Sequence, residues 1–113
     1  MSPESAIAAL DRAVHVSGEQ IRLRRTTGTQ QIPLDVDCHA CVRGYAPDEL
    51  LGTIAQGDRK VILSPTEMKN AQWTWPPRVN DKCIIGGKQF TVFGTDNLSI
   101  GGQLVRIELQ VRG

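Results

Sequence analysis

The sequence contains few aromatic residues, few cysteines and no long apolar run. Aromatic residues make up only 4% of the 113 residues, so the core must consist mainly of Val, Ile and Leu, which favour strands. Three cysteines are an odd number, which fits reduced thiols better than a framework of disulfide bonds. No apolar stretch approaches the roughly 20 residues that a membrane-spanning helix requires. The start, Met1-Ser2-Pro3-Glu4, lacks the basic and apolar parts of a signal peptide, so we expect a cytoplasmic protein.

The chain also lacks an excess of charge of one sign. Its formal net charge is +1, with seven Lys or Arg and eight Asp or Glu over residues 1–60, and six and four over residues 61–113. Affinity for duplex nucleic acid usually depends on a strong basic excess, so this balance disfavours a dedicated duplex-binding domain. The length predicts a single domain, residues 1–113.

The first segment has the pattern of an amphipathic helix. Ser2-Pro3-Glu4 offers an N-cap, a proline suited to the first helical position and an acidic residue in the first turn. Ile7, Leu10 and Val14 follow at spacings of three and four, which places them on one face. We therefore expect a helix over about residues 3–16.

The rest of the chain has mainly strand patterns. The clearest is the alternation of apolar and polar residues from Leu34 to Arg43. Gly86-Gly87 suits a tight hairpin, and Asn97–Gly102 is expected to form a second connection. The sequence predicts a mainly β domain, a small antiparallel barrel or sandwich of five or six strands over about residues 19–113, with the N-terminal helix and a long loop. The predicted strands are 20–25, 34–43, 61–63, 82–85, 88–92 and 105–112.

Two segments between the predicted strands follow neither pattern. Residues 44–57 contain Pro47 and scattered apolar residues, and we expect a long excursion with one helical turn around Asp48–Leu51. Ser64-Pro65 has the character of a helix start and predicts one or two turns to about Ala71.

Cys38, His39 and Cys41 are the residues that most suggest a metal site. Along a strand, Cys38 and Cys41 point to opposite faces because their separation is odd, and Cys83 and His15 are far away in the sequence. We therefore expect a buried Cys38 with His39 and Cys41 at the surface, and no metal, cofactor or catalytic site.

Arg22, Arg24 and Arg25 form the most basic stretch of the chain. Arg22 and Arg24 share one strand face, and a ring of such faces would line a basic channel. The alternative is an ordinary solvated strand whose arginines face the acidic residues of the strand 34–43. The sequence leaves both interpretations open.

Trp73 and Trp75 lie in a segment stiffened by Pro76 and Pro77. Indoles bury much area at a low entropic cost and are enriched at protein interfaces, so these four residues are candidates for contacts between subunits. The alternative is that one tryptophan closes an end of the barrel.

Five short stretches in the second part of the chain follow one another in a recognisable order. They are GDRKVILS at 57–64, WTWPP at 73–77, NDK at 80–82, IGGKQFTV at 85–92 and LQVRG at 109–113. This order resembles the small head–tail joining proteins of long-tailed phages and prophages, the head–tail connector or head-closure (stopper) proteins. RGYAPDEL at 43–50 fits the loop that these proteins carry upstream. Asn80 stands where the family usually has Gly, which alters only a turn.

The resemblance covers roughly residues 40–113 and implies a structural virion protein that is not an enzyme. Such proteins form a homo-oligomeric ring, here expected to be six-fold or twelve-fold, at the neck between head and tail. The implied partners are portal or adaptor proteins, the tail terminator or tail tube, and double-stranded DNA that passes through the channel without sequence recognition. The implied docking or gating loop comprises Tyr45, Pro47, Asp48, Glu49, Leu50, Leu51 and Ile54.

Other functions remain open from the sequence. One alternative is that the chain is another neck or tail-completion protein, such as an adaptor or a tail terminator. A small β-barrel that binds nucleic acid would need exposed aromatic residues beside basic ones. A metal-dependent or thiol enzyme would need the segment 38–41 to converge with Cys83.

Overall fold

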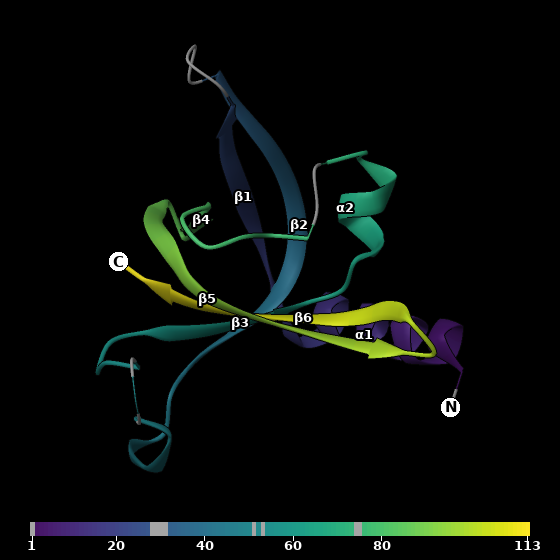
Figure 1. The fold of residues 1–113 in the computed structure, drawn as a ribbon, viewed down its shortest axis with the longest axis horizontal. Coiled ribbons are helices and arrows are strands. Elements are labelled where there is room, and N and C mark those ends of the chain that lie inside the picture. Colours follow the sequence, from purple (N-terminus) through teal and green to yellow (C-terminus); the bar gives the residue numbers. More distant parts are fainter. Residues whose placement is uncertain (1, 28–31, 51, 53, 74–75) are drawn as a thin grey trace.

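Six antiparallel strands close into a small barrel, and the N-terminal helix lies against its outside (Figure 1). The computed structural model describes residues 2–27, 32–50, 52, 54–73 and 76–113. The strand order is β1-β2-β3-β6-β5-β4, and β4 pairs with β1 to complete the barrel. This confirms the predicted mainly β fold and selects the barrel over the sandwich. The strands are β1 (Glu19–Thr27), β2 (Ile32–Gly44), β3 (Arg59–Leu63), β4 (Lys82–Ile85), β5 (Lys88–Ile100) and β6 (Gln103–Arg112).

The N-terminal helix α1 (Pro3–Ser17) begins where the sequence predicts. The Ser2 hydroxyl caps it by accepting a hydrogen bond from the Ser5 backbone N–H at 3.1 Å. The helix packs against β2, β3 and β6, and Val14 is its buried contact residue. In the described part of the chain, no helix combines the length and apolar character that crossing a membrane would need.

The barrel interior contains the apolar side chains that alternate along the strands. On β2, for example, Val36, Cys38 and Ala40 are buried while Asp35 and Asp37 are exposed. The core is made mainly of aliphatic residues, as the shortage of aromatic residues predicts. Its members are Ile21, Leu23, Val36, Cys38, Ala40, Val61, Leu63, Met68, Trp73, Cys83, Ile85, Phe90, Val92, Ile107, Leu109 and Val111.

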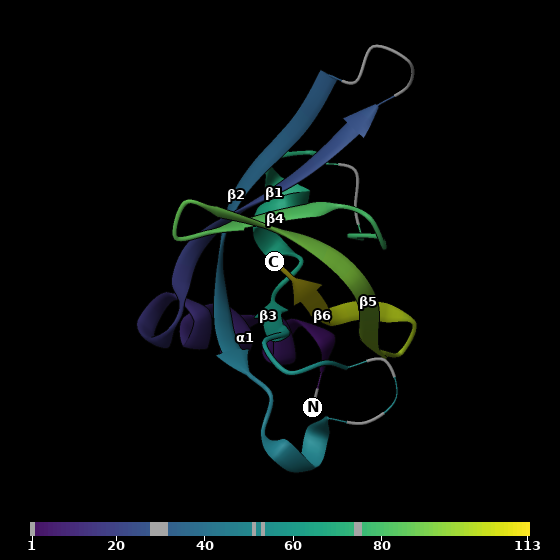
Figure 2. The same ribbon diagram turned by 90° about the vertical axis from the view of Figure 1, so that its left-hand side faces the viewer.

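Three projections extend from the barrel (Figures 1 and 2). One is the β1–β2 hairpin, one is the β5–β6 hairpin that runs alongside α1, and one is the segment 45–58 between β2 and β3. The last contains a single turn of 3-10 helix, η1 (Pro47–Glu49), slightly earlier than the turn predicted around Asp48–Leu51. The short helix α2 (Thr66–Asn70) follows β3 within the range predicted for it.

The prediction of a connection at Asn97–Gly102 is wrong. Strand β5 continues to Ile100, and the turn is confined to Gly101 and Gly102, which have φ angles of 58° and 81°. The strand here belongs to the projecting hairpin, so residues 95–99 are exposed on both faces and carry no apolar alternation. Two irregularities of register, next to Gly94 and Ser99, break the pattern further.

Candidate functional site

Arg22 and Arg24 point outward from β1, and each lies opposite an aspartate of β2. Arg22 Nε donates to Asp37 Oδ1 at 2.7 Å, and Arg24 Nε donates to Asp35 Oδ1 at 2.9 Å. These hydrogen bonds are the main reason that the pKa values of both aspartates are lowered. Of the two interpretations left open by the sequence, the side chains adopt the paired one. The strip formed by these two arginines and two aspartates therefore carries two positive and two negative charges, which offset each other.

Arg25 has the opposite orientation and lies inside the protein. It shares the inward face of β1 with Ile21 and Leu23, and it is only 7% exposed. Its Nη2 donates to Asp81 Oδ2 at 2.6 Å, and its guanidinium lies 4.7 Å from the centroid of the Trp73 ring. Arg25 is therefore a brace between β1 and the segment before β4, and its side chain is not available to line a channel. Because successive residues of a strand point to opposite faces, the sequence alone places Arg25 on the other face from Arg22 and Arg24.

Trp73 belongs to the core of the single chain. It is 6% exposed, packs in the main apolar cluster and carries Arg25 over its ring. Pro77 is also buried, and Pro76 is half-buried. Trp75 lies outside the described residues, so its role as a contact between subunits stays a prediction.

The segment 45–58 is fastened where it leaves β2. Arg43 donates from Nη1 and Nη2 to the two carboxylate oxygens of Glu49, at 3.1 and 3.2 Å. Glu49 also accepts the Ala46 backbone N–H at 2.8 Å. These hydrogen bonds, with Arg43 the larger contributor, lower the pKa of Glu49 to about 2. A charged pair near the surface thus links the end of β2 to the first turn of the segment.

A second set of contacts fastens the segment where it returns to β3. The Asp58 side chain is only 1% exposed, and its carboxylate accepts Arg112 Nε at 2.7 Å and Nη2 at 2.9 Å. It also accepts Gln110 Nε2 at 2.9 Å and the Ala55 backbone N–H at 3.0 Å. The pKa of Asp58 is therefore held well below its usual range, chiefly by Arg112.

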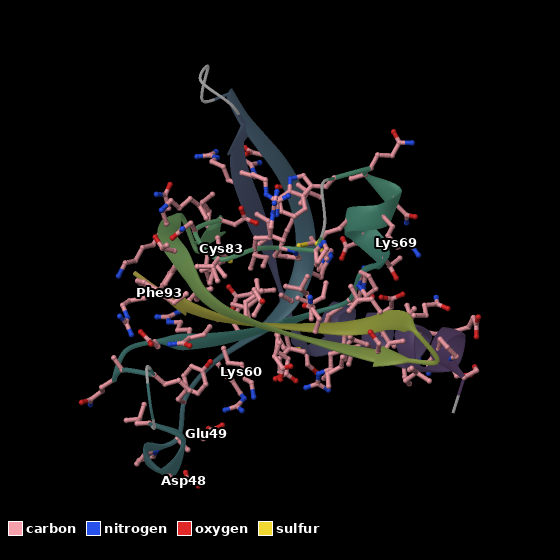
Figure 3. The ribbon with its side chains drawn as sticks, viewed as in Figure 1. Asp48, Glu49, Lys60, Lys69, Cys83 and Phe93 are labelled. Atoms are coloured by element: carbon pink, nitrogen blue, oxygen red, sulfur yellow. The ribbon has the colours of Figure 1, made fainter. Side chains whose placement is uncertain are left out.

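Between these two anchors, the segment presents an exposed tip and a half-buried inner side. Tyr45, Glu49 and Ile54 line a hollow of about 470 Å³ whose opposite wall is formed by β5 and β6. Pro47 and Asp48 are exposed, and Figure 3 places Asp48 at the far end of the projection. Leu50 is half-buried, and Leu51 lies outside the described residues. Of the candidate docking residues that the structure describes, Pro47 and Asp48 are therefore accessible, while Tyr45, Glu49, Leu50 and Ile54 are half-buried.

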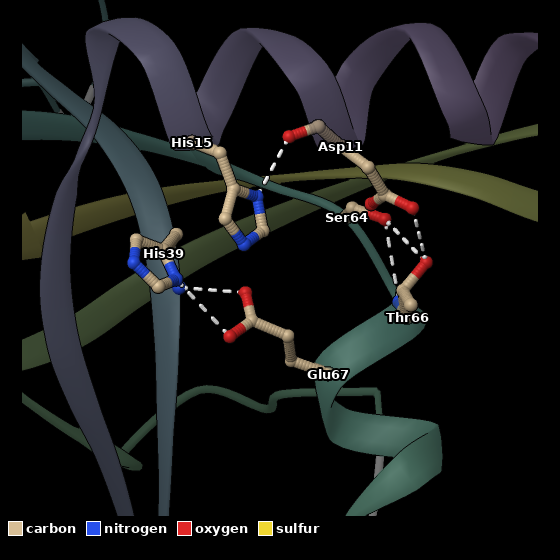
Figure 4. Close-up of polar contacts among 6 residues, drawn as sticks. All are labelled: Asp11, His15, His39, Ser64, Thr66 and Glu67. Atoms are coloured by element: carbon tan, nitrogen blue, oxygen red, sulfur yellow. Dashed lines mark hydrogen bonds and ion pairs between the residues drawn. The ribbon is translucent and has the colours of Figure 1, made fainter.

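A separate polar cluster lies where α1, β2 and α2 meet (Figure 4). It joins His15 of α1, His39 of β2 and Glu67 of α2, and one potential ligand atom from each lies within 4.8 Å of the others. The two imidazole rings are stacked, with centroids 4.2 Å apart and planes inclined by 26°. The sequence suggested only Cys38 and Cys41 as possible co-ligands of His39, because His15 and Glu67 are distant in the chain and no pattern links them to it.

The cysteines are distributed as alternation along the strands predicts. Cys38 is 1% exposed inside the barrel, Cys41 is half-buried on the outside, and Cys83 is fully buried. Burial raises the pKa of Cys38 and that of Cys83 to about 12. Cys38 and Cys83 are therefore protonated at neutral pH and unsuited to act as nucleophiles.

Comparison of the sequence with protein-family models finds no match, and neither does a search of curated proteins. The resemblance to head–tail joining proteins therefore rests on the residues of this chain alone.

Proposed function

We propose that this protein is a head-closure (stopper) protein of a long-tailed phage or prophage. In this proposal, six or twelve copies form a ring at the neck of the virion. The ring closes the DNA-filled head and joins it, between portal or adaptor proteins on one side and the tail terminator or tail tube on the other. Its role is structural, and double-stranded DNA passes through its channel without sequence recognition.

The observation that carries the proposal is the contact between two of the motifs on which the resemblance rests. GDRKVILS supplies Asp58, and the closing LQVRG supplies Arg112. These residues are 54 positions apart, and they form an ion pair, buried on the Asp58 side, at the base of the segment 45–58. The contact supports the proposal because it brings two of the motifs together at the base of the loop proposed to dock or gate.

The shape and charge of the surface also support the proposal. The chain measures 40 × 37 × 26 Å, and its three projections offer contact surfaces beyond the closed barrel. A strip on which Arg22 and Arg24 are each paired with an aspartate holds a passing DNA duplex only weakly, because its charges offset each other.

Binding of single-stranded nucleic acid has less support among the described residues. Such binding uses exposed aromatic rings beside unpaired basic side chains. Here Trp73 is buried, and Arg22 and Arg24 are paired with acids. The ring of Phe93 is exposed, but the guanidinium above it belongs to Arg112, which is paired with Asp58. Retention of the purified protein on single-stranded DNA that decreases with salt would favour this alternative.

Replacing residues Asp48–Ala55 with a Gly/Ser linker of equal length tests the proposal. The variant keeps Asp58 and Arg112 and loses the solvent-exposed pair of Arg43 and Glu49, so we expect the barrel to melt cooperatively, with a loss of only about 1 kcal/mol. In phage particles that carry the variant, DNA-filled heads should leak or fail to acquire tails.

A double variant, Asn70→Ser with Ala71→Ser, is a matched control, because these exposed residues lie at the end of α2, away from the loop (Figure 1). It should give normal particles. Normal infectious particles with the linker would refute the docking role. Unfolding of the linker variant would instead mean that Leu50 and Ile54 serve mainly to cap the barrel.

A further inference from the structure

We propose that His15, His39 and Glu67 bind a divalent transition-metal ion such as Zn²⁺. The sequence led us to expect no metal site, because only Cys38, Cys41 and their neighbour His39 were close in the chain. In the folded protein, His39 instead lies beside His15 of α1 and Glu67 of α2.

The chemistry of the three side chains favours zinc over the hard cations. Two imidazoles and one carboxylate are a ligand set that zinc sites use, with the remaining positions filled by water. Mg²⁺ and Ca²⁺ prefer oxygen ligands and gain little from imidazole. The side chains of His39 and Glu67 are 33% and 31% exposed, so solvent can reach the remaining coordination positions.

The orientation of His15 suits a ligand. Its Nδ1 lies 2.8 Å from the backbone carbonyl oxygen of Asp11, which can only accept a hydrogen bond. Nδ1 therefore carries the hydrogen, and in the neutral ring the lone pair is on Nε2. Metal-ligating histidines commonly make this second hydrogen bond, because it fixes the tautomer and the direction of the ring.

Glu67 of α2 is oriented by a hydrogen bond from the backbone of β2. Its Oε1 accepts the His39 backbone N–H at 2.8 Å, and its Oε2 lies 3.1 Å from His39 Nδ1. A bound cation would take the place of the proton between Oε2 and Nδ1. The backbone hydrogen bond to Oε1 can persist, so the carboxylate remains anchored when the ion is bound.

The three elements are braced against one another without any ion. Thr66, the first residue of α2, donates through its hydroxyl to Asp11 Oδ2 of α1 at 2.9 Å. At Gly18, a Cβ would lie 2.4 Å from the Val14 carbonyl oxygen and 2.5 Å from that of Ala40. The absence of a side chain thus allows the end of α1 to approach β2 closely, beside His39. The scaffold therefore holds the three side chains near one another before the ion binds.

Only a small adjustment is needed to complete the site. Two ligand atoms on a tetrahedral zinc ion are about 3.3 Å apart, given zinc–nitrogen bonds of about 2.0–2.1 Å. The potential ligand atoms here lie within 4.8 Å of one another, and the stacked rings must turn for their lone pairs to converge. His15 is exposed at the end of α1, so its ring can make this movement.

Zinc binding can be measured on the whole protein, prepared without a histidine tag and treated with a chelator. Equilibrium dialysis against ZnCl₂ with metal analysis should give one Zn²⁺ per chain, and the melting temperature should rise with the Zn²⁺ concentration. MgCl₂ should cause no rise. His15→Ala and Glu67→Gln should each weaken Zn²⁺ binding at least tenfold.

Cys41→Ser is the matched control, because Cys41 lies on the outer surface of the same strand as His39. This variant should bind Zn²⁺ as the unaltered protein does. His15→Ala removes an exposed side chain, so its melting temperature without zinc should stay near that of the parent and exclude misfolding as a cause. The proposal is overturned if Zn²⁺ does not bind stoichiometrically, if His15→Ala binds it normally, or if Cys41→Ser loses it.

Discussion

Asp58→Asn should destabilise the folded protein, because it removes a buried charge at the base of the segment 45–58. The carboxylate is 1% exposed and accepts four hydrogen bonds, two of them from Arg112. An asparagine retains one acceptor oxygen but turns an NH₂ group toward the remaining donors. Removing one member of a buried pair costs about 3–5 kcal/mol. Arg112 is 39% exposed and can recover water, so we expect about 2–3 kcal/mol.

The assay is urea denaturation of Asp58→Asn beside Asp48→Asn, which removes an exposed carboxylate from the same projection. The control should stay within about 0.5 kcal/mol of the parent. Thermal melting should show a loss of roughly 6–15 °C for Asp58→Asn.

The dependence on pH tests whether charge is the cause. The pKa of Asp58 is lower in the folded state than in the unfolded state, so its stabilisation is complete above the ordinary aspartate pKa of about 3.9. It is lost as the pH falls below that value. The difference between parent and Asp58→Asn should therefore shrink below about pH 4. A difference that stays constant from pH 7 to pH 2 would refute the argument.

Two further predictions concern packing and thiol chemistry. Gly18→Ala should lower the free energy of unfolding by about 1–3 kcal/mol in urea denaturation, because the new Cβ would overlap backbone atoms. Gly44→Ala is the control and should be nearly neutral, since no atom lies within 4 Å of the position that its new Cβ would take. Equal effects of the two substitutions would contradict the close approach of α1 to β2 at Gly18. In native protein, a maleimide should label Cys41 first, while Cys38 and Cys83 should react only on unfolding because burial raises the pKa of each to about 12. Mass spectrometry of the labelled peptides checks this order, and rapid labelling of Cys83 would show that the barrel opens readily.

The sequence predicts the fold best where one face of a strand is buried and the other is wet. From Asp35 to Ala40 the two faces differ in exposure, so the alternation of residue types marks the strand. From Thr95 to Ser99 both faces are exposed, and the same signal is absent although the strand continues. Barrel closure depends on the pairing of β1 with β4, which is a contact between distant segments that alternation does not encode.

The candidate sites were predictable to the extent that their residues are neighbours in the chain. The pairing of Arg22 and Arg24 with an acidic strand was foreseen as one of two alternatives, because strands that follow each other usually pair. The contact of Asp58 with Arg112 and that of Glu67 with His39 arise only when the chain folds. Each joins elements from different parts of the sequence, and single residues in loops or helix ends carry no periodic signal of their partners.

The closure of the barrel has a consequence for its dynamics. In the described structure, β1 pairs with β2 through nine residue pairs but with β4 through only three, from Arg22 to Arg24. Immediately beyond this short contact, the buried pair of Arg25 and Asp81 joins the same two parts of the chain. Among the strand pairings of the described residues, the junction between β1 and β4 has the fewest paired residues, so we expect it to open first. Its backbone amides should exchange with solvent earlier than those between β1 and β2, and each opening would expose two strand edges to which a second chain can pair.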